Sequence, residues 1–363
     1  MPYIISIGKK PPKHSVKQEH AVEFAKEMFS STYSNIDRYL KAFENAQIQT
    51  RHFVEDLSWY QENHTFEEKN EAYINHAVTL GVQAIKHCLT REDLLKNEVP
   101  FEEIDAIFFI SSTGISTPSI DVKIINELPF QETIKRIPIW GLGCAGGAAG
   151  ISRAFEFCRA YPKAKVLILS IELCSLTFQH DDHSKSNLIG TSLFADGVAC
   201  ALMVGDLTEY NYYVNDDTYV NILGTQSNLL RNSEDVMGWN IRNNGFYVVF
   251  SRNIPSIIAS WLKPNVESFL KRYGIQLNDI SYFIAHPGGK KVLDAYKECL
   301  SLNETQLEVS KRILMKYGNM SSVTVLYVLE EYMKKKLGKR GQYGLLAAMG
   351  PGFSSEQVLV RWE

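Results

Sequence analysis

The 363-residue sequence lacks the features that mark membrane, secreted and nucleic-acid-binding proteins. No apolar run approaches the roughly 18 residues that a transmembrane helix needs, so we expect no integral membrane segment. The apolar run in the opening MPYIISIGKK is too short for a secretory signal, so we expect a cytoplasmic protein whose first element is a strand. The net charge of −3 gives no basic field that would favour nucleic acid as a partner.

Paired cysteines are also missing. The six cysteines are scattered, and no two of them have C-x-x-C spacing. We therefore expect buried free thiols rather than disulfides or a zinc site, with one or two reactive thiols at most. The QHDDH segment at residues 179–183 contains ligand-type residues, but its spacing fits no recognised metal ligand set. The sequence thus predicts neither a metal nor a redox cofactor.

No linker or low-complexity segment divides the chain, but two parts of it resemble each other. From about residue 104, short apolar strands alternate with helical patterns, which is typical of an α/β fold. FEEIDAIFFISSTG at 101–114 and LNDISYFIAHPGG at 277–289 both run from an acidic residue through an apolar strand to a turn with glycine. We interpret this as a duplicated α/β unit, with one half over residues 1–215 and the other over 216–363.

One turn is unusually rich in glycine: WGLGCAGGAAG, at residues 140–150. Cys144 lies in this turn, between an apolar strand and a helix that begins near Ala145. The unpaired N–H groups and partial positive charge of a helix N-terminus lower the pKa of a thiol, which would make Cys144 a nucleophile. The alternative is inert packing, because cysteine is among the most often buried residue types.

Two further candidates lie on loops of the second half. His286 follows an apolar strand and precedes Pro-Gly-Gly, and Asn319 lies in YGNMSS at a helix start. Duplicated halves bring equivalent loops to one crevice, so Cys144, His286 and Asn319 are predicted to converge. There His286 as an imidazolium would lower the pKa of the thiol further, and Asn319 would donate to an oxyanion. For each residue alone, a structural histidine or a helix N-cap asparagine remains open.

Gly141, Gly143 and Gly146 also fit the G-x-G-x-x-G spacing of a dinucleotide-binding turn. A strand precedes these glycines and a helix follows them, as in a Rossmann unit. Against this interpretation, Glu172 lies well beyond the ~20-residue interval at which the acidic residue of that motif is expected. The motif also gives no role to Cys144. A nicotinamide-dependent dehydrogenase is therefore the weaker alternative.

Taken together, five motifs resemble those of the type III polyketide synthases, the chalcone and stilbene synthase family of the thiolase-like superfamily. They follow the family's order over nearly the whole chain: WGLGCAGGAAG, GTSLFADGVACALMVGD, YFIAHPGGKKVLDA, YGNMSS and MGPGFSSEQVLV. The resemblance implies an α/β fold of five layers, αβαβα, built from two similar halves. It also implies a homodimer and a catalytic set of Cys144, His286 and Asn319.

The resemblance further implies an activity. An acyl-CoA would acylate Cys144, and malonyl-CoA would lose CO₂ to give an enolate that His286 and Asn319 stabilise and that attacks the acyl group before ring closure. Arg38 and Lys41 match positions at which the family contacts the phosphates of coenzyme A, whereas a third basic position is Asn45 here. A ketoacyl synthase III, which uses an acyl carrier protein and the same three catalytic residue types, is the alternative. No metal or redox cofactor is implied.

The family's substrate pocket also has matching positions in this chain. They are Phe194, Thr117, Thr177, Val248 and the loop of Gly350, Pro351, Gly352 and Phe353. Phe194 matches a gatekeeper aromatic, and Val248 falls where the plant enzymes have a second gatekeeper, a phenylalanine. The smaller valine is predicted to widen the site. From this we expect bulky or long aliphatic starters and alkylpyrone products, as in bacterial alkylpyrone synthases.

Overall fold

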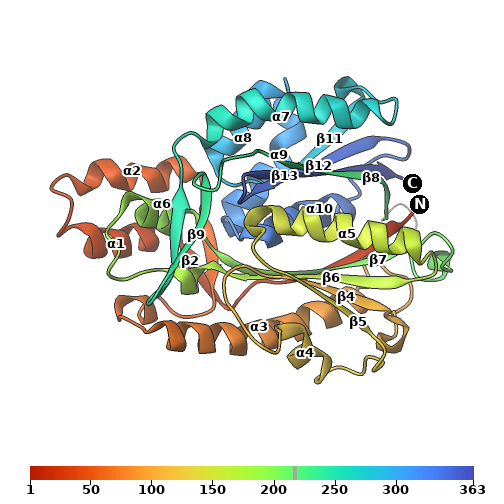
Figure 1. Ribbon diagram of the computed structural model, residues 1–363, viewed down its shortest axis with the longest axis horizontal. Coiled ribbons are helices and arrows are strands. Elements are labelled where there is room, and N and C mark those ends of the chain that lie inside the picture. Colours follow the sequence, from red (N-terminus) through yellow and green to blue (C-terminus); the bar gives the residue numbers. More distant parts are fainter. Residues whose placement is uncertain (216–218) are drawn as a thin grey trace.

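The computed structural model describes residues 1–215 and 219–363. Two sheet regions alternate with three helical layers, in the order helix, sheet, helix, sheet, helix (Figure 1). The described strands of both regions form one hydrogen-bonded sheet of nine strands, in the order β11-β12-β13-β8-β1-β7-β6-β4-β5. The five layers agree with the αβαβα fold expected from the sequence. The predicted start of the second half, residue 216, lies outside the described residues, so that boundary stays a prediction.

The first sheet region is mixed and deeply buried. Its strands are β1 (Tyr3–Lys10), β4 (Ala106–Ile110), β5 (Lys135–Ile139), β6 (Lys165–Leu173) and β7 (Asp196–Val204). Strand β4 is parallel to β5 and β6, whereas β7 is antiparallel to β6 and β1. Every residue of β7 is buried, because helices cover both faces of this region. A strand covered on both faces has an almost continuous apolar sequence, as DGVACALMV does.

The second sheet region joins the first through a short contact. Its strands are β8 (Val220–Leu229), β11 (Ile280–Ala285), β12 (Tyr343–Gly350) and β13 (Ser354–Trp362). Strand β8 pairs with β1 at two positions, Tyr3 with Asn221 and Ile4 with Val220. Beyond this junction the two regions diverge and leave room for a helical layer between them (Figure 1).

The middle layer consists of two buried helices, α5 (Gly146–Ala160) and α10 (Thr324–Lys334). Small residues let α5 lie close to its neighbours. A Cβ on Gly147 would lie 2.1 Å from the carbonyl oxygen of Ser322, and one on Gly150 would lie 2.8 Å from Ile110. Since real Cβ atoms do not approach other atoms so closely, the glycines after Cys144 are required by this packing.

The outer helical layers cover the remaining sheet faces. Helices α3 (Phe66–Leu89) and α4 (Ile120–Ile125) pack on the first region, and α7 (Ile254–Lys271), α8 (Lys290–Cys299) and α9 (Glu304–Tyr317) lie on the second (Figure 1). Helix α3 begins with a capping box, in which Thr65 and Glu68 each accept the other's backbone N–H. Among the described residues, no helix combines the length and the apolar character needed to cross a bilayer.

Several smaller elements gather at one end of the layers, on the left in Figure 1. They are helices α1 (Gln18–Phe29), α2 (Ile36–Ala46) and α6 (Lys185–Leu193), with the strand pairs β2 (His14–Lys17)–β3 (Thr50–Phe53) and β9 (Met237–Arg242)–β10 (Gly245–Phe250). The helices share an apolar core of their own, which includes Phe24, Phe43 and Leu188. The candidate active site lies under this group.

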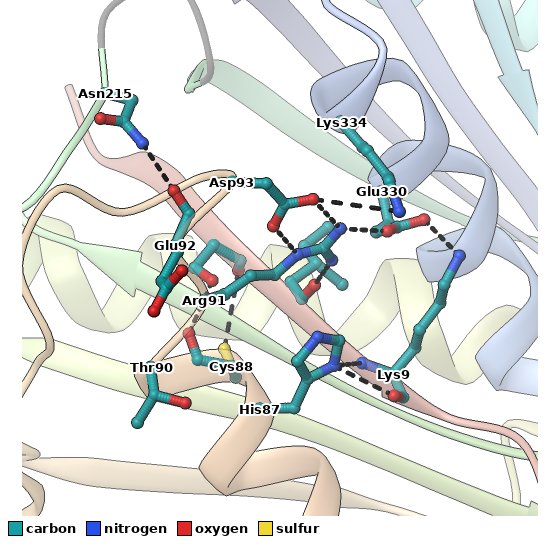
Figure 2. A network of polar contacts seen from close by, with 12 residues as sticks. Lys9, His87, Cys88, Thr90, Arg91, Glu92, Asp93, Asn215, Glu330 and Lys334 are labelled. Carbon is teal, nitrogen blue, oxygen red and sulfur yellow. Dashed lines mark hydrogen bonds and ion pairs between the residues drawn. The ribbon is translucent and has the colours of Figure 1, made fainter.

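A buried ionic cluster connects the two halves. Arg91 follows α3 and is 4% exposed, and its guanidinium lies 2.5 Å from the carboxylate of the fully buried Glu330 in α10. Arg91 also pairs with Asp93 and donates to the carbonyl oxygen of Ile7. Glu330 accepts a second cation, Lys9 of β1, at 2.6 Å. Figure 2 shows these side chains converging on Glu330 and Arg91, so the cluster holds α10 against β1 and the end of α3.

Replacing Glu330 with glutamine tests how much this cluster stabilises the fold. Glu330→Gln leaves Arg91 buried without its full countercharge, and we expect the free energy of unfolding to fall by about 3–5 kcal/mol. The measurement is the urea dependence of the far-UV circular dichroism. As a control, Glu308→Gln removes a carboxylate that is 66% exposed and pairs with Arg312, and its unfolding midpoint should match the wild type. Equal midpoints for both variants would contradict the structural role of the cluster.

Candidate active site

Cys144 lies where strand β5 leads into helix α5. The chain passes through a short 3-10 helix, Gly143–Ala145, directly before α5 begins. Gly141 and Gly143 have φ angles of +89° and +46°, a backbone region in which a side chain is strained. A Cβ on Gly143 would also lie 2.7 Å from Pro351. Turn geometry and packing therefore explain these glycines without a dinucleotide, and the predicted position of Cys144 at a helix N-terminus is confirmed.

His286 follows strand β11, and its backbone N–H donates to the carbonyl oxygen of Ala347 in β12. The side chain is 3% exposed, yet neither ring nitrogen has a hydrogen-bond partner among the described residues. A purely structural histidine would satisfy at least one ring nitrogen, because a buried polar atom without a partner destabilises the fold. This favours the functional interpretation of His286.

Asn319 lies between α9 and α10 and joins three segments. Its side-chain Nδ2 donates to the carbonyl oxygen of Gly288, next to the His286 loop, at 3.0 Å, and its Oδ1 accepts from the N–H of Ser321 at 2.9 Å. Its backbone N–H donates to Leu193 and its carbonyl accepts from Ala195. The amide thus holds a turn, but Asn319 is not an N-cap, because the residues before the two helices that follow are Met320 and Val323. One Nδ2 hydrogen remains beyond the bond to Gly288.

The three residues line one cavity of about 510 Å³. Cys144, His286 and Asn319 therefore converge as the sequence predicted, although they lie on separate loops. Most of the cavity wall is apolar and includes Leu188, Leu193, Met237, Phe250, Met349 and Phe353. Basic side chains line another part of it: Arg38, Lys41, Lys185, Arg252, Lys290 and Lys291. Asn45, which stands at the third predicted phosphate position, lines the cavity with them.

The enclosed setting opposes charge on both candidate catalytic groups. Burial raises the pKa of the Cys144 thiol to about 12 and lowers that of His286 to about 3. The sequence interpretation, in which a helix N-terminus and an imidazolium lower the thiol pKa, omitted this desolvation. Neither group ionises readily alone, but proton transfer from the thiol to the imidazole leaves two opposite charges that stabilise each other. Because His286 lines the same cavity, we expect ionisation of Cys144 to depend on it.

A polar network that the sequence analysis missed lies behind Cys144. The thiol donates to Oγ of Ser321 at 3.5 Å. The next residue, Ser322, donates to the carboxylate of Glu172 at 2.5 Å, and Ser112 donates to the same carboxylate through its N–H and its hydroxyl. Burial raises the pKa of Glu172 to about 7, and its negative charge further disfavours a thiolate at Cys144. The sequence signal that could have indicated this network is the serine pair Ser321–Ser322 in YGNMSS.

Three of the predicted pocket residues lie outside the Cys144 cavity. Phe194, Thr177 and Val248 line a second, mostly apolar cavity of about 50 Å³. Residues on different faces of α6 line the two cavities, and the rings of Phe194 and Phe250 contact each other with centroids 5.6 Å apart. The predicted widening at Val248 is wrong for the Cys144 cavity. Val248 pairs across the β9–β10 hairpin with the bulky Trp239, whose ring also contacts Phe194.

The remaining pocket predictions also need correction. Thr117 is exposed and lies outside both cavities, on a loop before Pro118. In the predicted loop, Phe353 alone lines the Cys144 cavity. Gly350 packs against Leu142 and Ala145, and Pro351 packs against Gly143. Gly352 lies beside Leu229. The glycine-rich loop therefore supports the turn that carries Cys144 more than it shapes the cavity.

Side chains of the types that bind metals do not gather into a cluster in the described residues. In residues 1–215 and 219–363, no group of three or more His, Cys, Asp or Glu side chains is arranged to hold a metal ion. His180 of the QHDDH segment instead contacts the carbonyl oxygen of Gln61 and its own neighbour, Asp181.

A cysteine, an imidazole and an amide around one cavity can transfer an acyl group through the sulfur. Together with its family matches, this makes the chain an acyltransferase of the condensing type. Models of the two domains of the chalcone and stilbene synthases match it, the N-terminal domain over residues 2–207 and the C-terminal domain over residues 221–362. The chain belongs to this family, the type III polyketide synthases.

Individual relatives agree with this membership. A Bacillus subtilis protein named "Putative chalcone synthase" is 50% identical, with 100% of this chain and 99% of that protein covered. The Mycobacterium tuberculosis protein "Alpha-pyrone synthesis polyketide synthase-like Pks18" is 29% identical over 96% of this chain and 88% of its own. The crystal structure of 1,3,6,8-tetrahydroxynaphthalene synthase from Streptomyces coelicolor superposes with a TM-score of 0.91 at 30% identity, covering 99% of both chains.

Alkylation of Cys144 tests its dependence on His286. In His286→Gln the thiol loses its proton acceptor while burial still raises its pKa. We therefore expect iodoacetamide to react about tenfold or more slowly than in the wild type at pH 7.5. The rate in the variant should keep rising with pH beyond 9. Peptide mass spectrometry measures both Cys144 and Cys299, and Cys299, half-buried and outside the cavity, serves as the internal control. Identical pH profiles of Cys144 in both proteins would contradict the dependence.

Proposed function

We propose that the protein loads a long-chain acyl-CoA starter onto Cys144, extends it by decarboxylative condensation with malonyl-CoA and releases alkylpyrones. The observation that carries this proposal is the composition of the Cys144 cavity. A nucleophile, an unpaired imidazole and an amide donor lie in a largely apolar chamber of about 510 Å³ that also carries six basic side chains. Apolar walls suit an aliphatic chain, and the cations suit the phosphates of coenzyme A.

The basic residues support direct use of coenzyme A thioesters. Arg38 and Lys41 lie on α2, Lys290 and Lys291 at the start of α8, and Arg252 just before α7. Cations from three separate elements around one cavity give an anionic ligand several charge-assisted contacts. Because Arg38 and Lys41 are exposed, each contact is weak alone and the binding depends on the set.

Acyl transfer to Cys144 follows from the pairing of thiol and imidazole. As the sulfur attacks the thioester carbonyl, His286 accepts its proton, a new carbon–sulfur bond forms, and the bond to the sulfur of coenzyme A breaks. The proton on His286 then passes to the departing coenzyme A thiolate. The N-terminal end of α5 stabilises negative charge on the sulfur during this step.

Decarboxylation of the malonyl group uses the same histidine in its neutral form. With burial lowering its pKa, His286 is an N–H donor that carries no charge at neutral pH. The free hydrogen on Nδ2 of Asn319 is the second donor to the thioester oxygen. When the bond to the carboxylate breaks and CO₂ leaves, the electron pair forms an enolate that these donors stabilise. The enolate carbon then attacks the acyl group on Cys144, and the thiolate is the leaving group.

The aliphatic chain would lie along Leu188, Met237 and Phe250 and extend toward the second cavity. That cavity holds only a few water-sized groups. Trp239 pairs with Val248 across the hairpin, and its ring contacts Phe194. We therefore propose that Trp239 and the contact between Phe194 and Phe250 limit the length of the acyl chain. The relative named for alpha-pyrone synthesis supports a pyrone product.

A homodimer is proposed on separate grounds. Strand β5 is an edge of the nine-stranded sheet. Near it, Trp140 and Ile115 are 51% and 46% exposed, and the indole N–H of Trp140 donates to the carbonyl oxygen of Gly114, next to Ile115. An exposed apolar group beside an unpaired strand edge is a surface that a second copy would cover.

A product assay tests the proposed activity. Purified protein with malonyl-CoA and a series of short, long and aromatic acyl-CoA starters should give pyrones from the long-chain starters, identified by mass spectrometry. Cys144→Ala should give none, since it removes the acyl acceptor. The same acyl groups on a carrier protein are the comparison. Conversion of the carrier-bound substrates alone would favour the alternative, a single condensation of the ketoacyl synthase III type.

A variant of the hairpin tests the limit on chain length. Trp239→Ala removes the indole that contacts Phe194, so we expect the preferred starter to become longer in competition assays with mixed acyl-CoAs. Ile241→Ala, two residues along the same strand and 54% exposed in the wild type, is the matched control and should keep the original preference. An unchanged preference in Trp239→Ala would show that another residue sets the limit.

A further inference from the structure

Arg51, in strand β3, is a buried cation without an ion pair. Its exposed fraction is 1%, and it forms no ion pair among the described residues, although the negative charge of the buried Asp196 acts on it from farther away. The ring of Phe53 lies 5.3 Å from the guanidinium carbon. Burial lowers the pKa of Arg51 to about 9, so the side chain remains charged at neutral pH. A buried unpaired charge opposes folding, which raises the question of what this arginine does.

The guanidinium holds the C-terminal end of helix α6. Nη1 donates to the carbonyl oxygens of Thr191 and Phe194, at 2.6 and 2.8 Å. Carbonyl groups at a helix C-terminus lack partners within the helix and carry partial negative charge, so a cation is favourable there. The other two nitrogens, Nε and Nη2, have no partner among the described residues. The two bonds from Nη1 therefore fix where the guanidinium lies.

The aliphatic part of Arg51 contacts the segment that carries Asn319. A Cβ on Gly318 would lie 2.8 Å from Cγ of Arg51, and Gly318 has a φ of +71°. The backbone just before Asn319 thus rests on the arginine side chain. On the other side, the N–H of Asn319 donates to Leu193 at 2.9 Å, and its carbonyl accepts from Ala195 at 2.9 Å. Arg51 touches both segments of this backbone bridge.

We propose that Arg51 is a positioning residue that holds the α6 end, and through it Asn319 and Phe194, in the geometry required for decarboxylation of malonyl-CoA. The inference rests on the proposed function, which gives Asn319 the role of enolate donor. Arg51 lines the small second cavity rather than the Cys144 cavity, so it acts on the reaction through Asn319. Acylation of Cys144 uses the α5 turn and His286, neither of which Arg51 contacts, and should not depend on it.

The two half-reactions can be measured separately. Loading of an acyl-CoA is followed by the mass of the intact protein. Decarboxylation is followed as conversion of malonyl-CoA to acetyl-CoA in a Cys144→Ala background, which excludes condensation and makes the readout independent of the starter. For Arg51→Met we expect kcat of decarboxylation to fall up to ~100-fold with a nearly unchanged KM, because small displacements of a positioned donor have effects of this size. Loading should stay within about twofold of the parent.

Two further variants separate positioning from stability. The lysine of Arg51→Lys can still donate to both carbonyls. We therefore expect kcat of decarboxylation in Arg51→Lys to be at least tenfold higher than in Arg51→Met. Arg91→Met is the control, because it removes another buried arginine, which belongs to the ionic cluster with Glu330. It should lower the midpoint of thermal unfolding without changing the ratio of the decarboxylation rate to the loading rate. If Arg51→Met does not fold, Arg51→Gln, which keeps one donor, replaces it with the same expected ratio.

The outcomes are distinct. A selective loss of decarboxylation that lysine rescues supports the inference. Parallel losses of loading and decarboxylation, as from general destabilisation, or decarboxylation within about threefold of the parent would overturn it. If the parent with Arg51 intact decarboxylates no malonyl-CoA, the proposed function fails and the inference fails with it.

Discussion

The close approach of helix α5 to Ser322 is the constraint on which the site depends. The carbonyl oxygen of Ser322 lies almost where a Cβ on residue 147 would be. Helix α5 can therefore lie against the segment before α10 only because Gly147 has no side chain. Cys144 precedes α5 and Asn319 precedes α10, so this contact sets the position of a residue of the first half relative to one of the second. The bond between Cys144 and Ser321 is a direct result.

The same close packing determines the electrostatics. It buries the imidazole and the Glu172 carboxylate and partly buries the thiol, and this desolvation makes each group resist charge on its own. Charge can then form only in compensated pairs or against aligned donors, which are the conditions that acyl transfer and enolate formation require. The Glu172 carboxylate already accepts hydrogen bonds from Ser112 and Ser322. By contrast, neither ring nitrogen of His286 has a hydrogen-bond partner among the described residues. This contrast supports the proposed role of His286 in proton transfer.

The sequence predicted the α/β architecture and the convergence of Cys144, His286 and Asn319, because duplication and loop position follow from its internal repeat and glycine patterns. The five layers followed from the resemblance to a family. The sequence interpretation failed where the outcome depends on which side chains pack together within or between elements. The neighbour of Val248 is Trp239, through the register of a hairpin, and a residue-by-residue match to a family could not reveal that compensation. Thr117 was assigned to a cavity from its position alone, yet it is exposed. Arg51 gave no signal in the sequence, since TRHF reads as an ordinary strand.

Hairpin β9–β10 has a further consequence. It forms its own two-stranded sheet and pairs with no strand of the nine-stranded sheet. It supplies Met237 and Phe250 to the Cys144 cavity and Val248 to the second cavity, while the ring of Trp239 contacts Phe194. The candidate reacting groups lie on loops of the layered core, whereas part of the cavity wall comes from a segment outside it. We therefore expect exchange of this one hairpin to give evolution a route to new products without rebuilding the catalyst.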